Sequence, residues 1–77
     1  MTTVRYFAAA EDAAGVATET TDAATLGALR SELVDEHPAL GPILGRCALL
    51  VDGTRVADDF AFSGAETVDV LPPFAGG

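Results

Sequence analysis

The chain has 77 residues, of which 49% are hydrophobic, and its 12 acidic residues against four arginines and no lysine give a net charge of −8. A chain of this length forms one small domain that buries only about 60–65% of its unfolded surface, which leaves no room for a deep catalytic cleft. The composition therefore argues against a protein that is catalytic alone. The acidic charge also argues against a nucleic-acid binder, because such proteins carry a basic footprint.

The excess of acidic residues has three interpretations, and the sequence leaves all of them open. It suits docking to a basic partner surface, since opposite electrostatic fields speed encounter. It equally suits a surface selected for solubility, or the average composition of an acidic proteome.

The sequence offers few groups for cross-linking, metal binding or membrane insertion. Cys47 is the only cysteine, so no disulfide forms within the chain, which suits a reducing compartment. One cysteine and one histidine do not supply a zinc or iron–sulfur site. The first residues lack the pattern of a signal peptide, and no apolar stretch approaches the length of a membrane span. We therefore expect a cytoplasmic protein without a bound metal ion or membrane contact.

The first third of the chain predicts two strands with a short helical turn between them. Residues 3–8 alternate in polarity and are rich in β-branched and aromatic side chains, which favours a strand. Residues 9–14 predict a helical turn that ends at Gly15. Residues 16–21 alternate again and are expected to form a hairpin with the first strand. Phe7 falls either in an exposed docking patch or in the core, and the alternation does not separate the two.

One substantial helix follows. Thr25 is its predicted N-cap, because a hydroxyl accepts a hydrogen bond from an early backbone N–H. Pro38 is expected to end the helix, His37 before it is expected to be solvated surface, and residues 41–45 are expected to be a turn-rich connector. The apolar stripe of the helix falls at helical spacing and consists of Leu26, Leu29, Leu33 and Val34.

The second half of the chain predicts three more strands. Residues 47–51 form a continuous apolar run that predicts a buried strand, with Cys47 packed in the core. Residues 52–53 are Asp-Gly, which is a strong signal for a tight turn into a strand over residues 54–57. Residues 66–71 are the last predicted strand.

This order of elements predicts an α+β domain. A right-handed crossover from the second strand would pack the helix on one face of a mixed sheet of about five strands. The first and last strands would then pair in parallel at its centre. We assign residues 1–71 to this domain and residues 72–77 to an extended C-terminal tail.

The tail has the composition of an arm that reaches into another protein. The two terminal glycines have no side chain and adopt backbone conformations closed to other residues, so they fit a narrow tunnel and present the Gly77 carboxylate inside it. The two prolines restrict the backbone and are expected to end the last strand and stiffen the arm. The alternative is a frayed terminus without function. The segment reads Leu71, Pro72, Pro73, Phe74, Ala75, Gly76 and Gly77.

These features together resemble the β-grasp, ubiquitin-like family, and within it the small sulfur-carrier subunit of molybdopterin synthase. The likeness is carried by residues 4–8 leading to residues 13–15, by the turn at residues 50–53, and by residues 68–77. The predicted helix falls in the expected place, so the resemblance spans the whole chain, and its specific part is the ending.

The resemblance implies a mechanism that partners complete. An E1-like adenylating enzyme would use ATP and magnesium to activate the Gly77 carboxylate, and a sulfur donor would convert it to a thiocarboxylate. The tail would then enter the large subunit of molybdopterin synthase, in a heterotetramer, and deliver sulfur to the pterin precursor. The carrier itself would hold no permanent cofactor. Beside the reacting Gly77, the residues expected to contact partners are Gly76, Ala75, Phe74, Pro73, Pro72 and Phe7.

Other functions remain compatible with the same residues. A ubiquitin-like modifier would end in an isopeptide bond between Gly77 and a target lysine. A sulfur carrier of this design also serves thiamine, cysteine or transfer-RNA thiolation pathways. A β-grasp binding domain would have an inert tail. A β-grasp ferredoxin is excluded, because its cluster needs four cysteines.

Overall fold

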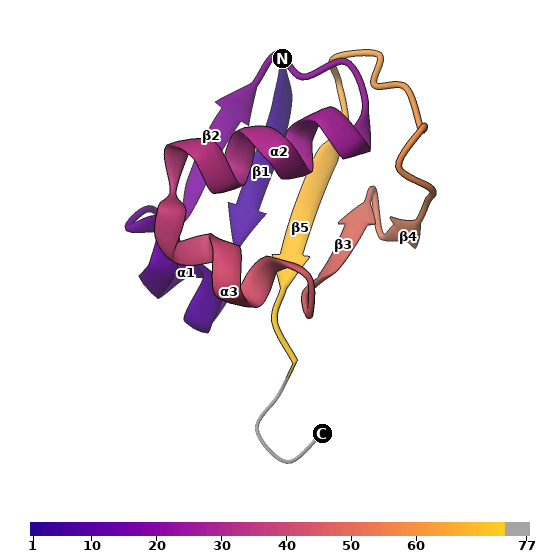
Figure 1. Cartoon of the computed structure of the whole chain (residues 1–77). Helices are drawn as coiled ribbons and strands as arrows, with labels where there is room; N and C mark the ends of the chain where they lie inside the picture. Colours follow the sequence, from indigo (N-terminus) through magenta and orange to yellow (C-terminus); the bar gives the residue numbers. More distant parts are fainter. Residues whose placement is uncertain (74–77) are drawn as a thin grey trace.

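The structure is a computed structural model that describes residues 1–73, so the predictions made for Phe74, Ala75, Gly76 and Gly77 lie outside the described residues. The described residues form one five-stranded sheet with the main helix across one face (Figure 1). In chain order the elements are β1 (Thr2–Tyr6), α1 (Ala9–Ala14), β2 (Thr18–Thr21), α2 (Leu26–Glu36), the 3-10 helix η1 (Pro38–Leu40), α3 (Gly41–Leu44), β3 (Ala48–Val51), β4 (Thr54–Arg55) and β5 (Thr67–Leu71).

The strand order is β2-β1-β5-β3-β4. β1 and β5 pair in parallel at the centre, with Val4 beside Val68, and β2 pairs antiparallel with β1. β3 pairs antiparallel with both β5 and β4. The predicted α+β architecture, including the central parallel pair and the hairpin of the first two strands, is confirmed.

The core lies between the sheet and α2. The alternation of β1 turns Val4 and Tyr6 toward the helix and leaves Arg5 exposed on the other face. Burial of one leucine side chain contributes about 1.5–3 kcal/mol, so the apolar stripe of α2 holds the helix on the sheet. The largest fully buried apolar side chains are Leu26, Leu29, Leu33, Leu40, Val4, Val68 and Val70.

Both ends of α2 follow from local chemistry. The Thr25 hydroxyl accepts a hydrogen bond from the Ala28 N–H at 3.1 Å, as predicted for the N-cap. The helix ends at Glu36, and His37 is its C-cap. Pro38 then begins η1 rather than continuing the helix.

The segment after η1 differs from its prediction. Residues 41–45 were expected to be a connector, but Gly41–Leu44 is a short helix, α3. Pro42 lies in its first turn, where a helix tolerates proline because the missing N–H has no partner there in any case. Leu44 is buried, so packing of this turn against the core stabilises it.

The β3–β4 hairpin also differs in part. The predicted tight turn is confirmed, with φ of 49° at Asp52 and 83° at Gly53. β4 has only two residues instead of the predicted four, so it covers half of β3. β3 is buried on one face only: Leu49 and Val51 are buried, whereas Ala48 and Leu50 are partly exposed.

Ala8, directly before α1, is a second non-glycine residue with a positive φ. Its φ is 51° and its ψ is −124°, a region that favours glycine. Gly15 ends α1 with a φ of 78°, as the sequence predicted. None of the helices formed within residues 1–73 is long and apolar enough to cross a membrane.

Candidate functional site

The base of the tail is held by the centre of the sheet. β5 lies between β1 and β3, and its last residue, Leu71, pairs with Ala48. Pro72 is buried and Pro73 is exposed. The chain beyond β5 therefore leaves the domain from an anchored point at one end of the sheet (Figure 1).

An apolar row lies beside this point, on the sheet face opposite α2. We call Phe7, Leu71 and Ala48 the tail-base row. Ala48 pairs with Leu71 across the β3–β5 ladder, and the Phe7 N–H donates to the Val70 carbonyl at 3.2 Å, which places Phe7 on the other side of β5. Phe7 is 37% exposed, so the structure places it on the surface rather than in the core.

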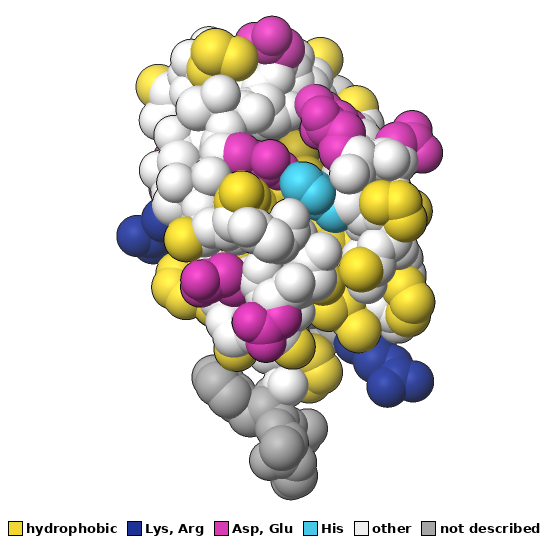
Figure 2. Space-filling model, turned by 90° about the vertical axis from the view of Figure 1, so that its left-hand side faces the viewer, with side chains coloured by type: hydrophobic (Ala, Val, Ile, Leu, Met, Phe, Trp, Pro, Cys, Tyr) yellow, Lys and Arg dark blue, Asp and Glu magenta, His cyan; other side chains and the backbone are white. Residues whose placement is uncertain are grey.

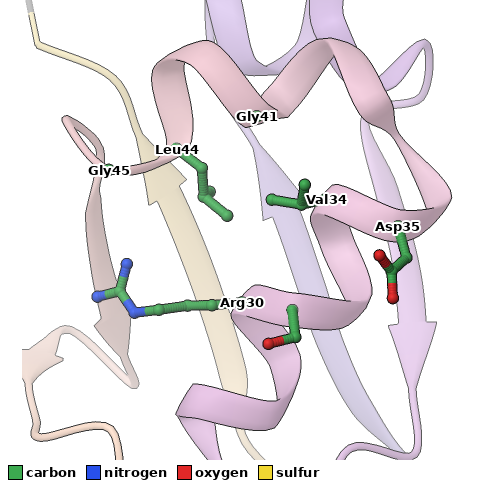
Figure 3. A pocket seen from close by; sticks show the side chains of 7 residues that line it. Arg30, Val34, Asp35, Gly41, Leu44 and Gly45 are labelled. Atoms are coloured by element: carbon green, nitrogen blue, oxygen red, sulfur yellow. The ribbon is translucent and has the colours of Figure 1, made fainter.

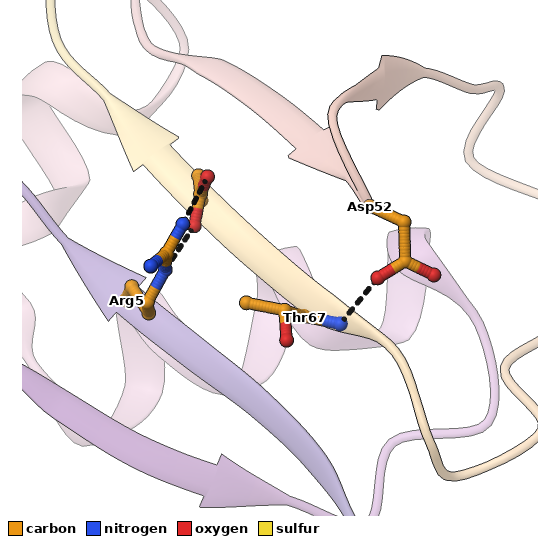
Figure 4. A network of polar contacts seen from close by, with 4 residues as sticks. Arg5, Asp52 and Thr67 are labelled. Carbon is orange, nitrogen blue, oxygen red and sulfur yellow. Dashed lines mark hydrogen bonds and ion pairs between the residues drawn. The ribbon is translucent and has the colours of Figure 1, made fainter.

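A charged pair borders the tail-base row. The Arg5 guanidinium donates two hydrogen bonds to the Asp69 carboxylate, from Nε at 2.6 Å and from Nη2 at 2.9 Å (Figure 4). The hydrogen bond and the charge of Asp69 raise the pKa of Arg5. The Arg5 guanidinium also lies 5.5 Å from the centre of the Phe7 ring, within cation–π range. Asp69 thus fixes Arg5, and Arg5 restrains Phe7.

This arrangement has the form of a docking surface. Aromatic and aliphatic groups with a polar rim are typical of the centre of a protein interface. Asp69, two residues before Leu71 on β5, pairs with Leu50 of β3. Leu50 is partly exposed, so it extends the apolar surface toward β4. A partner that binds this face is positioned beside the start of the tail.

His37 is not the solvated residue that the sequence predicted. Its side chain is 17% exposed, and its Nε2 lies 2.7 Å from Glu19 Oε1. The Tyr6 hydroxyl donates to the same oxygen, and the Tyr6 and His37 rings pack edge to face. Figure 2 shows the histidine amid acidic side chains on this side of the molecule. β2 carries Glu19 to the end of α2, a contact that no local sequence signal reveals.

Burial and the hydrogen bond to Glu19 both raise the pKa of Tyr6. The phenol therefore stays protonated and remains a hydrogen-bond donor. The contact links β1, β2 and the C-cap of α2, which is a structural role.

Glu66 organises the loop before β5, and the sequence interpretation missed it. Its carboxylate accepts hydrogen bonds from the Ser63 N–H at 2.8 Å, the Ser63 hydroxyl at 3.0 Å and the Gly64 N–H at 3.0 Å. These bonds, led by that of the Ser63 backbone, lower the pKa of Glu66 to about 2. At the same end of β5, Asp52 accepts from the Thr67 N–H at 3.0 Å (Figure 4).

Cys47 is buried, as predicted, and its thiol lies 3.4 Å from the Ile43 carbonyl oxygen. Burial raises the pKa of this thiol. The part of the chain that the structure describes contains no group of three His, Cys, Asp or Glu side chains able to hold a metal ion.

Comparison with known proteins gives the family. The sequence profile of the ThiS family matches residues 4–77. The fold is similar to that of SAMP1 from Haloferax volcanii, with 26% identity, a TM-score of 0.80, and coverage of 99% of this chain and 98% of that one. It is also similar to a putative molybdopterin converting factor subunit 1 from Pyrococcus furiosus, with 25% identity, a TM-score of 0.80, and coverage of 95% and 97%.

A third similar structure is the complex of subunits 1 and 2 of the molybdopterin-converting factor from Helicobacter pylori, where identity is 23%, the TM-score 0.75 and coverage 99% and 97%. A search of curated protein sequences found no match. The matched structures confirm the predicted β-grasp, ubiquitin-like fold. The chain belongs to the ThiS family, the β-grasp proteins that act as sulfur carriers or ubiquitin-like modifiers.

Proposed function

We propose that this protein is the sulfur-carrier subunit of a molybdopterin synthase and that the Gly77 carboxylate carries the sulfur. The observation that supports this proposal most is the anchored base of the tail, with buried Pro72 at the end of the central strand and the tail-base row beside it. The likeness to a converting factor subunit 1 at 25% identity agrees with it.

The proposed chemistry has two steps on the terminal carboxyl group. In the first, a Gly77 carboxylate oxygen attacks the α-phosphate of ATP on an adenylating partner, and pyrophosphate leaves with magnesium neutralising its charge. In the second, hydrosulfide (HS⁻) released by a sulfur donor attacks the acyl carbon, AMP leaves as the bond from carbon to oxygen breaks, and the S–H proton is lost to solvent. The product is a thiocarboxylate, which a large subunit would bring to the pterin precursor.

The domain contributes positioning. Gly76 lets the backbone approach closely in a partner's tunnel, since it has no side chain. Pro72 and Pro73 reduce the conformational entropy lost when the tail is ordered in that tunnel. Phe7 supplies an exposed aromatic ring at the place where a partner would approach the tail, and truncation of such rings often costs much of an interface's binding energy.

A ubiquitin-like modifier is the second candidate, and one observation favours it. The similar structures include SAMP1 from Haloferax volcanii, a small archaeal modifier protein, at 26% identity. In this case the activated Gly77 would form an isopeptide bond with a lysine of a target. The chain has no lysine, so such targets would be other proteins.

The experiment that separates the two candidates is the intact mass of the protein purified from its native host under amine-free, non-reducing conditions. A fraction heavier by one exchange of oxygen for sulfur, mapped to Gly77, is the expected result for the carrier. Lysine-linked conjugates with only unmodified carboxylate would instead support the modifier. A variant without Gly76 and Gly77 is the control. If this variant fully replaced the function of the parent protein in its native host, both proposals would be refuted.

A further inference from the structure

A small pocket beside the uncovered part of β3 has two arginines in its lining. It has a volume of about 260 Å³ and lies between α2, the start of β3 and β4. The chain has only four cations among its 77 residues, and two of them line this pocket. The lining residues are Arg30, Gly45, Cys47, Ala48, Leu49, Arg55 and Val56, and none of them is acidic.

Arg30 reaches the pocket from α2. Figure 3 draws a neighbouring pocket that shares Arg30 and Gly45 with this one, and in it the Arg30 side chain extends from the helix toward Gly45 and the neighbouring strand. Its Nε donates to Asp58 Oδ1 at 2.9 Å, and the Asp58 side chain is 64% exposed. That ion pair fixes the guanidinium through one of its five N–H groups, so the terminal amino groups remain available to a ligand.

Arg55 reaches the pocket from β4. It is exposed, and no carboxylate among residues 1–73 forms an ion pair with it. β4 pairs only with Leu50 and Val51, so Ala48 and Leu49 line the pocket along a part of β3 that β4 does not cover.

Cys47 supplies the third polar side chain of the lining, and its thiol does not repel a bound anion. Burial raises the pKa of the Cys47 thiol, which is therefore uncharged at neutral pH. The remaining lining side chains are apolar or absent, so the charge of the lining itself comes from the two guanidinium groups, with the Asp58 carboxylate beside Arg30. Guanidinium groups bind tetrahedral oxyanions strongly because their N–H groups match the spacing of the oxygens.

We infer that Arg30 and Arg55 form a binding site for a doubly charged oxyanion of the phosphate class. The volume of about 260 Å³ corresponds to roughly nine waters at about 30 Å³ each, which is room for one tetrahedral anion with some of its hydration. The Asp58 carboxylate bonds only Arg30 Nε, so it opposes this anion through charge repulsion rather than by occupying the terminal amino groups. The site is separate from the chemistry proposed at Gly77, and neither depends on the other.

The test is a titration of the full chain with inorganic phosphate, followed by ¹H–¹⁵N NMR, with sodium chloride at matched ionic strength as the reference. Saturable shifts of the Cys47, Ala48 and Leu49 amides are expected with phosphate and not with chloride. Each of Arg30→Gln and Arg55→Gln should weaken binding about tenfold or more, since each removes hydrogen bonds to a charged group.

Two further variants make the result specific. Arg46→Gln changes the charge equally but lies outside the lining, and it should leave the affinity unchanged. Asp58→Asn removes the opposing carboxylate and should tighten binding. Repeating the titration with AMP shows whether the site takes free phosphate or a phosphate group carried by a larger molecule. If AMP binds as tightly as inorganic phosphate, the ligand is a phosphate group on a larger molecule. If AMP binds more weakly, the ligand is the free ion.

Shifts that do not saturate, or equal losses for Arg46→Gln and Arg55→Gln, would overturn the inference. A loss of affinity in Asp58→Asn would do the same. The thermal stability of each variant without phosphate reports whether it is folded. A chain without Gly76 and Gly77 should bind phosphate like the full chain, so failure of the proposed sulfur chemistry would not affect this outcome.

Discussion

Replacement of Phe7 by alanine tests whether the tail-base row is a docking surface. Phe7 is 37% exposed, and a phenylalanine buries about 200 Å² in full, so roughly 75 Å² remains to be covered by a partner. At about 25 cal/mol per Å² this area corresponds to roughly 2 kcal/mol, or about a 25-fold change in dissociation constant.

The assay is pyrophosphate exchange catalysed by the adenylating enzyme of the same organism, with this protein as the varied substrate. Phe7→Ala should raise KM about 25-fold, by the area estimate above, and leave kcat nearly unchanged, because the ring contributes binding at a distance from the reacting carboxylate.

Thr20→Ala is the matched control, since Thr20 is exposed on β2 and pairs with Thr3 near the far end of β1. Phe7→Leu should recover most of the affinity because it keeps an apolar side chain. Equal KM values for Phe7→Ala and the parent, with both proteins folded, would refute the reasoning.

Three further predictions concern the scaffold. Thr25→Ala should lower stability by about 1 kcal/mol through loss of the N-cap, a fall in Tm of about 4–8 °C for a domain of this size; thermal unfolding checks it, and Thr25→Ser should retain most of the stability. Folding lowers the pKa of Glu66 to about 2, so its ionised carboxylate stabilises the folded protein at every pH above the pKa that Glu66 has in the unfolded chain. This contribution is lost as the pH falls toward the pKa of Glu66 in the folded protein. Urea unfolding between pH 6 and pH 2 should therefore show a weaker pH dependence in Glu66→Gln, and an unchanged profile would contradict the assignment. Ala8→Gly should raise Tm, because relief of strain at a φ of 51°, worth about 1–3 kcal/mol, exceeds the entropy cost of about 0.4–1 kcal/mol; a lower Tm would show that Ala8 is unstrained.

The part of the candidate site in the tail stays a prediction from composition, because residues 74–77 lie outside the described residues. The order of small, rigid and side-chain-free residues in the tail indicates an arm that enters a partner, without any knowledge of the fold. By contrast, the sequence did not decide whether Phe7 is exposed, because alternation assigns a residue to a face of the sheet and α2 then covers only one face. The arginine pocket was not predicted, since Arg30 and Arg55 come from separate elements.

The sequence by itself determined the N-cap of α2 and the turn between β3 and β4. Thr25 caps α2 through a bond to a residue three positions away, and Asp52 and Gly53 adopt positive φ within a two-residue turn; such features depend on backbone geometry and near neighbours alone. Only the tertiary structure decided the contacts between distant segments. Arg5 meets Asp69 across a separation of 64 residues because β1 and β5 pair in one parallel register. His37 and Glu19 meet because α2 ends beside β2. These contacts depend on how the elements pack together, and the amino-acid pattern near each residue contains no record of its partner.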